Sequence, residues 1–119
     1  MNLESLHSSA VLDIAGTLAR FEGDQQLFRD IIGFFLEDSP PLLSELRRAA
    51  EVSSAQAVRS TAHALRGLVA GCGGVRAAHA AQRVENAGQQ GDLSEIDEQI
   101  DLLENEIALL RQAANAYLQ

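Results

Sequence analysis

The sequence predicts an all-α protein: an antiparallel four-helix bundle with a short extra helix at its N-terminal end. Apolar residues recur at spacings of three and four along most of the 119 residues, and no segment alternates with the period of two expected of a half-buried strand. Alanine, the strongest helix former, occurs 19 times, and the only two prolines are adjacent. Connections of about two to six residues between the helices place successive helices antiparallel.

The first two helices are expected to begin at polar residues that can accept a backbone N–H. The short extra helix is predicted over residues 9–21 with Ser9 as its cap, and a long second helix over residues 24–51 with Asp24 as its cap. Pro40 and Pro41 interrupt the apolar pattern of the second helix, which resumes directly after them. We therefore expect one long helix that kinks at the prolines.

The third helix is expected to begin at Ser53 or Ser54 and to run to about residue 70. A glycine-rich turn separates it from a fourth helix, predicted over residues 75–89. The last helix is expected to be capped by Asp92 or Ser94. Its apolar residues keep a spacing of three and four: Ile96, Ile100, Leu103, Ile107 and Leu110.

The length predicts one domain over residues 1–119, because two domains would each have too small a core. We expect a monomer, since each of the four long helices has one apolar stripe and the bundle can bury all four. No apolar run approaches the roughly 18 residues of a membrane span. The N-terminus lacks the basic start and apolar run of a signal peptide, so a cytoplasmic protein is expected.

The composition excludes several classes of function. All nine basic residues are arginine, and the absence of lysine excludes a P-loop nucleotide site, Schiff-base chemistry and the lysine-dependent kinase folds. A single cysteine, Cys72, cannot form an intramolecular disulfide or a cysteine-rich zinc site. The net charge of -8 argues against nucleic acid as a partner. No histidine or carboxylate spacing predicts a metal site, and no cofactor is expected.

The third helix carries the unusual residues. At about 100° per residue, five residues fall on one line that faces the core, and His63 falls about 140° from it, toward solvent. Its neighbours one turn away are Arg59 and Arg66, and Gly67 and Ala70 leave the surface beyond it bare. The residues on the core line are Val58, Ala62, Leu65, Val69 and Cys72.

Gly67 and the local charge suggest a reason for this arrangement. Glycine within a helix costs roughly 0.5–1 kcal/mol relative to alanine, so its presence one turn from His63 suggests access for a partner. Six of the nine arginines lie between Arg47 and Arg83, which would stabilise an added anion such as phosphate. The alternative is an ordinary solvent-facing histidine beside a tolerated glycine.

The run Ala62-His63-Ala64-Leu65-Arg66-Gly67 resembles the signature of the histidine phosphotransfer (HPt) domain family. Gly73, ten residues after the histidine, and the pair Val84-Glu85 in the next helix match the same signature, and the resemblance covers about residues 11–92. It departs from the family pattern at three positions: Arg66 stands where lysine is usual, Gly71 where a small polar residue is common, and Gly74 could loosen the turn.

The resemblance implies a phosphoryl carrier in a two-component phosphorelay. His63 would accept a phosphoryl group from the phospho-aspartate of a receiver domain and pass it to another receiver. Arg66 and Arg59 would offset the phosphoryl charge, and Gly67 and Ala70 would admit the partner. The receiver would supply Mg²⁺, so the chain would be a carrier without a nucleotide site, not an independent enzyme.

Two rival functions remain open from the sequence. One is a bundle of the same fold that docks or sequesters a protein while His63 stays unphosphorylated. The other is an enzyme or metal protein that uses the bundle interior, against which the outward His63 counts. The sequence leaves open whether the chain is free-standing or one domain of a hybrid sensor kinase, and which receivers donate and accept.

Overall fold

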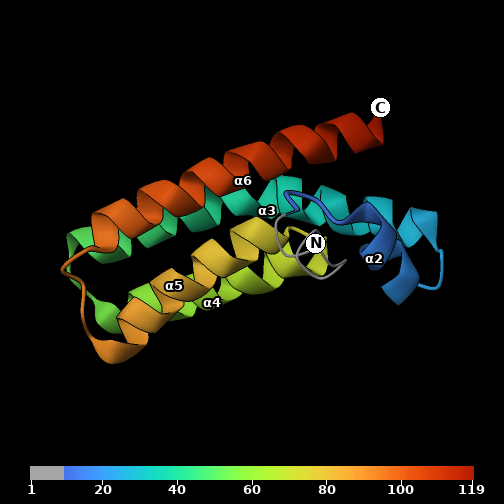
Figure 1. Ribbon diagram of the computed structural model, residues 1–119. Helices are drawn as coiled ribbons and strands as arrows, with labels where there is room; N and C mark the ends of the chain where they lie inside the picture. Colours follow the sequence, from blue (N-terminus) through green and yellow to red (C-terminus); the bar gives the residue numbers. More distant parts are fainter. Residues whose placement is uncertain (1–9) are drawn as a thin grey trace.

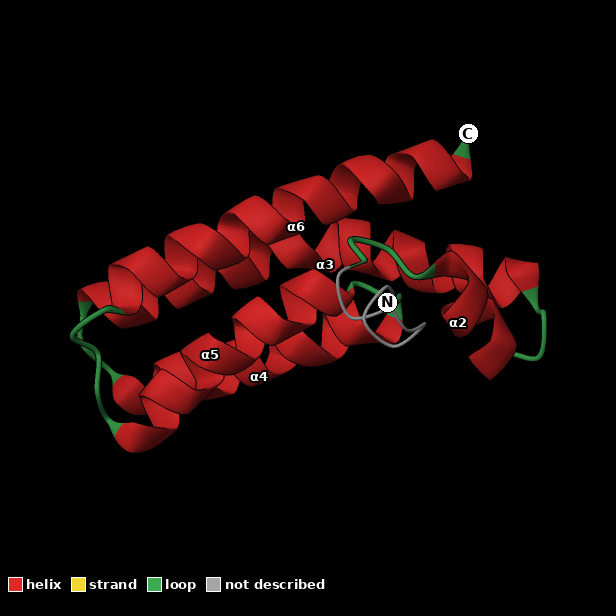
Figure 2. Cartoon of the chain, viewed as in Figure 1, coloured by secondary structure: helices red, strands yellow, loops and turns green. Residues whose placement is uncertain are grey.

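The computed structural model describes residues 10–119, where every regular element is a helix (Figures 1 and 2). Four long helices run antiparallel in sequence order, and a short helix lies beside the end of the bundle where the first of them begins (Figure 1). The predicted all-α bundle is thereby confirmed. The elements are α2 (Ile14–Arg20), α3 (Gln25–Glu51), α4 (Ala55–Gly71), α5 (Val75–Gln90) and α6 (Ile96–Leu118).

The core is built from the stripes that the helical periodicity selected. All five residues predicted on the core line of α4 are fully buried. The five apolar residues predicted to define the last helix are also buried, at 0–6% exposure. Phe28 and Phe35 of α3 are the largest side chains in this core, and Tyr117 of α6 packs on Phe28 with ring centroids 4.9 Å apart. Among the described residues, no helix is long and apolar enough to span a membrane.

Helix α3 continues through the proline pair as one element, as expected. Pro40 has no N–H, so the carbonyl of Leu36, four residues earlier, loses its helical donor. Arg111 of α6 supplies the replacement: its Nη1 donates to Leu36 O at 2.8 Å and to the hydroxyl of the buried Ser39 at 3.0 Å. A side chain from the last helix thus compensates the proline, which explains how the helix stays unbroken.

This compensation predicts a measurable coupling. We expect Arg111→Met to lower the free energy of unfolding by about 1–2 kcal/mol, because it leaves the Leu36 carbonyl without a donor. In a Pro40→Ala background the backbone gains an N–H that can serve that carbonyl, so the same substitution should cost much less. Urea unfolding of the four proteins measures the coupling, with the exposed neighbour Gln112→Met as control. Equal costs in both backgrounds would show that the compensation is absent.

The predicted start of the first helix is wrong. Ser9 lies outside the described residues, and α2 begins only at Ile14, with Asp13 as its cap. Asp13 Oδ1 accepts the N–H of Gly16 at 3.0 Å, while the Asp13 backbone N–H donates to Gly73 O at 2.8 Å. The backbone N–H of Asp13 is therefore used in a hydrogen bond to the α4–α5 turn. A helix that began earlier would have needed this N–H for its own hydrogen bonds.

The predicted caps of the last helix are also wrong, because α6 begins at Ile96. The Asp92 carboxylate accepts both the hydroxyl and the backbone N–H of Ser94, at 2.7 and 3.2 Å. These two hydrogen bonds lower the pKa of Asp92. They also close a turn over residues 92–94, so the helix begins only after that turn. The other expected caps are confirmed: Asp24 accepts the N–H of Leu27, and Ser54 that of Ala57, each three residues on.

Candidate functional site

His63 stands on the outer face of α4, as the periodicity predicts. Its side chain is 65% exposed, whereas its helical neighbours Ala62 and Leu65 are fully buried. The helix geometry therefore presents the imidazole to solvent on a rigid element rather than on a loop. The ring is available to a partner without any rearrangement of the bundle.

The ring is oriented by a carboxylate from the neighbouring helix. Glu85 of α5 places Oε2 at 2.9 Å from His63 Nδ1, and its side chain is only 14% exposed. A carboxylate accepts hydrogen bonds, so Nδ1 carries the proton and donates a hydrogen bond to Glu85 Oε2. Nε2 then keeps its lone pair. The contact selects the tautomer that is protonated on Nδ1 and leaves Nε2 without a proton.

Arg66 completes a cluster of three side chains. Its Nε lies 2.9 Å from Glu85 Oε1, and the two groups form an ion pair in which the Nε–H does not point at the oxygen. Its Nη2 lies 3.2 Å from His63 Nδ1. A guanidinium can only donate, so this longer approach competes with Glu85 for Nδ1, and it is not a hydrogen bond in the tautomer that the shorter Glu85 contact favours. Arg66 therefore neutralises Glu85 and holds it against the histidine.

A glycine brings Glu85 within reach of α4. Gly88 lies one turn after Glu85 on α5 and is buried, and a Cβ there would come within 2.6 Å of Arg59 N and 2.8 Å of Ala55 O. Both contacts are backbone atoms of α4, so a larger residue would push the helices apart. The short side-chain link from Glu85 to His63 thus depends on the close helix approach at Gly88.

The surface beyond His63 is open, as expected from the sequence. A Cβ added at Gly67 would meet no atom within 4 Å, and Ala70 is exposed. Gly67 is therefore not a close-packing site between helices. Arg59 is exposed too and makes no hydrogen bond or ion pair with His63 among the described residues.

The α4–α5 turn is closed tightly by two buried glycines. Gly73 has φ +91°, and a Cβ there would overlap the Thr17 hydroxyl of α2. Gly74 donates its N–H to Val69 O at 2.8 Å, and a Cβ there would overlap Leu110 of α6. The expected loosening at Gly74 is wrong, because glycine is the residue that lets α6 pack on this turn.

The sequence pattern assigned no role to Glu85 beyond its place in the Val84-Glu85 pair, whereas the structure places it beside His63. A signal was nevertheless present: between Glu51 and Asp92 the chain has one carboxylate, Glu85, among arginines. It follows the buried Val84, which places it at the edge of the core side of α5. A lone acid at that edge can reach the neighbouring helix.

Cys72 is not arranged for nucleophilic chemistry. Burial raises the pKa of the Cys72 thiol to about 11, so it is a poor nucleophile at neutral pH. Cys72 packs in the core at the end of α4, as expected. No group of three or more potential metal ligands occurs within residues 10–119.

An antiparallel helical bundle with an exposed histidine oriented by a carboxylate is the arrangement expected of a histidine phosphotransfer module. The Hpt domain family model matches residues 30–113, and the chain belongs to this family. Its structure is similar to that of histidine-containing phosphotransfer protein B (HptB) from Pseudomonas aeruginosa PAO1, with 26% sequence identity and a TM-score of 0.83. The match covers 92% of this chain and 95% of that one. Comparison with curated proteins gave no match.

Proposed function

We propose that His63 is the phosphoryl acceptor of a phosphorelay, taking the group from a receiver-domain phospho-aspartate and passing it to the aspartate of another receiver. The observation that supports this most is the Nδ1–Glu85 contact at 2.9 Å, since it leaves Nε2 as the exposed nucleophile. We expect the domain to act as a monomer, because the bundle buries the apolar stripes of its own long helices, and we also propose a cytoplasmic location.

The transfer step follows from the tautomer. The Nε2 lone pair attacks phosphorus, the bond from phosphorus to the aspartyl oxygen breaks, and the aspartate leaves as a carboxylate. The ring then carries a phosphoryl group on Nε2 and a proton on Nδ1, so it becomes cationic. The Glu85 carboxylate faces that proton and stabilises the new charge without any proton transfer. Reversal of the same step delivers the group to the second receiver.

Two arginines support the phosphoryl group in this proposal. Arg66 is held at Glu85 in the resting site, and rotation of its side chain would carry its guanidinium to the phosphoryl oxygens. Arg59, one turn before His63, adds positive charge to the same face. The receiver supplies Mg²⁺ and the acidic pocket. The domain is thus a carrier whose contribution is a positioned nucleophile and an open docking face around Gly67 and Ala70.

Incubation with isolated receiver domains, each phosphorylated with acetyl phosphate, tests the proposal. We expect label to move to this chain and to be labile in acid and stable in base, as a phosphohistidine is. Tight binding of a receiver without transfer of label would instead support a docking module in which His63 is silent. Label that resists acid would contradict a histidine acceptor.

A further inference from the structure

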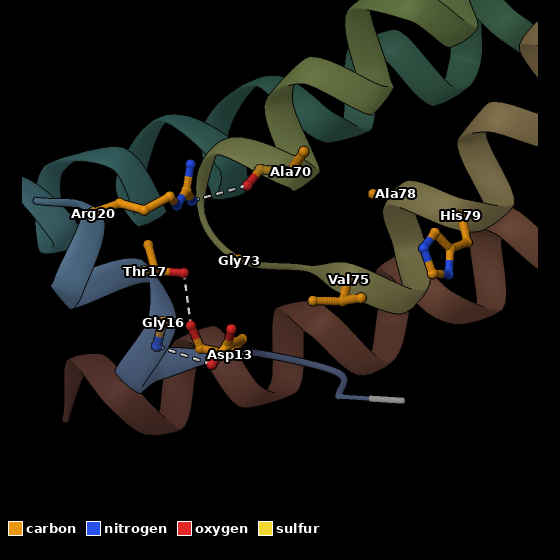
Figure 3. Close-up of a pocket in the computed structure, with 9 residues that line it drawn as sticks. All are labelled: Asp13, Gly16, Thr17, Arg20, Ala70, Gly73, Val75, Ala78 and His79. Carbon is orange, nitrogen blue, oxygen red and sulfur yellow. Dashed lines mark hydrogen bonds between the residues drawn. The ribbon is translucent and has the colours of Figure 1, made fainter. Parts of the chain in front are cut away.

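A preformed cavity lies two helical turns from His63, between α2 and the α4–α5 turn (Figure 3). Its volume is about 320 Å³, which is at the small end of the range for ligand pockets and leaves room for a large side chain. Its wall includes Ala70 from the open face of α4, together with Val75 and Ala78 from α5. The cavity therefore opens beside the face that presents His63.

The shape of the cavity is fixed by hydrogen bonds. The Asp13 backbone N–H donates to Gly73 O at 2.8 Å, and the Thr17 hydroxyl donates to Asp13 O at 2.6 Å. Arg20 Nη2 donates to the carbonyls of Ala70 and Gly71, at 3.3 and 3.4 Å. These contacts tie both ends of α2 to the end of α4 and the turn after it, so the hollow is part of the rigid fold.

Three of the four polar side chains in the cavity wall, Asp13, Thr17 and Arg20, already make hydrogen bonds, and the fourth is the exposed His79. Arg20 is engaged by two carbonyls, and Asp13 Oδ1 accepts the N–H of Gly16. The apolar part of the wall is formed by the methyl groups of Ala70, Val75 and Ala78. An apolar side chain would bury these methyl groups without disturbing any of these hydrogen bonds.

The position of the cavity identifies the source of that side chain. Ala70 lies seven residues after His63 on α4, about 10 Å along a helix that rises roughly 1.5 Å per residue. A standard interface buries about 800 Å² per partner, roughly a disc of 16 Å radius. A receiver whose aspartate meets His63 therefore covers the cavity mouth.

We propose that this cavity receives one large apolar side chain of the receiver domain and thereby selects which receivers exchange phosphate with His63. The inference rests on the proposed function, because it takes the receiver as partner. It assigns a specificity contact to Ala70, Val75 and Ala78, in addition to the chemistry at His63.

Filling the cavity mouth tests the inference. The probes are a panel of isolated receiver domains phosphorylated with acetyl phosphate, and phosphoramidate, a small donor that needs no docking. We expect Ala70→Leu to slow transfer from the most active receiver at least tenfold, while labelling by phosphoramidate stays within twofold of wild type. Ala70 is exposed, so the variant should fold, which a melting curve checks.

A matched variant controls for the substitution itself. Ala108→Leu makes the same change at an exposed alanine of α6, away from the α4 face. It should transfer within twofold of wild type. Normal receiver transfer to Ala70→Leu, or equal loss in Ala108→Leu, would overturn the inference and leave the proposed function standing. A wild-type chain that takes label from no receiver would overturn both.

Discussion

His63→Gln is expected to abolish phosphoryl transfer from receiver domains while leaving the fold intact. The amide of glutamine has no lone pair comparable to that of Nε2, so the nucleophile is lost. The side chain at this position is 65% exposed, and the glutamine N–H can still donate to Glu85. The free energy of unfolding should therefore change by less than about 1 kcal/mol. Transfer assays and urea unfolding measure the two effects.

The matched control is Asn105→Gln, on the exposed surface of α6. It introduces the same residue away from the α4 face and should transfer as wild type does. Receiver binding by His63→Gln should persist, because the docking face is unchanged. Transfer at the wild-type rate by His63→Gln would rule out His63 as the acceptor.

Gly88→Ala is expected to destabilise the bundle by about 2–3 kcal/mol, a large effect for one methyl group. The new Cβ would lie 2.6 to 2.9 Å from backbone atoms of Arg59 and Ala55, which cannot rotate away as a side chain can. The helices must separate, and Glu85, one turn earlier on α5, must move away from His63. We therefore expect slower phosphoryl transfer in the same variant, even under conditions where it remains folded.

Gly67→Ala provides the opposite case on the adjacent helix. A Cβ there meets nothing within 4 Å, so alanine should raise the free energy of unfolding by about 0.4–1 kcal/mol through helix propensity and a more restricted unfolded chain. Urea unfolding of the two variants compares the effect of the same glycine-to-alanine substitution on stability at two helical positions. These assignments would be contradicted if Gly88→Ala had the same free energy of unfolding as the wild type, or if Gly67→Ala lowered it by more than about 1 kcal/mol.

The outward direction of His63 was predictable because helical periodicity fixes which residues share a face. Once Val58, Ala62 and Leu65 define the core side of α4, the angle to residue 63 follows from geometry alone. The same reasoning found the buried stripe of α6. These features depend on local spacing, which the sequence displays directly.

The helix starts and the partner of His63 depend on contacts between distant residues. Ser9 and Asp13 are both plausible caps, and the hydrogen bond from Asp13 N to Gly73 O favours the later start. The link from Glu85 to His63 requires two helices to approach closely, and the periodicity does not measure that distance. Gly88 carried the signal, since a buried glycine between alanine-rich helices marks a close approach.

The nitrogen that carries the phosphoryl group is the most direct test of the proposed chemistry. We would phosphorylate the ¹⁵N-histidine-labelled domain with a receiver and record the imidazole nitrogen shifts and their coupling to phosphorus. The Glu85 contact predicts a single phosphohistidine, at His63, with phosphorus bonded to Nε2 and the proton retained on Nδ1. Phosphorus on Nδ1, or on any residue other than His63, would contradict it.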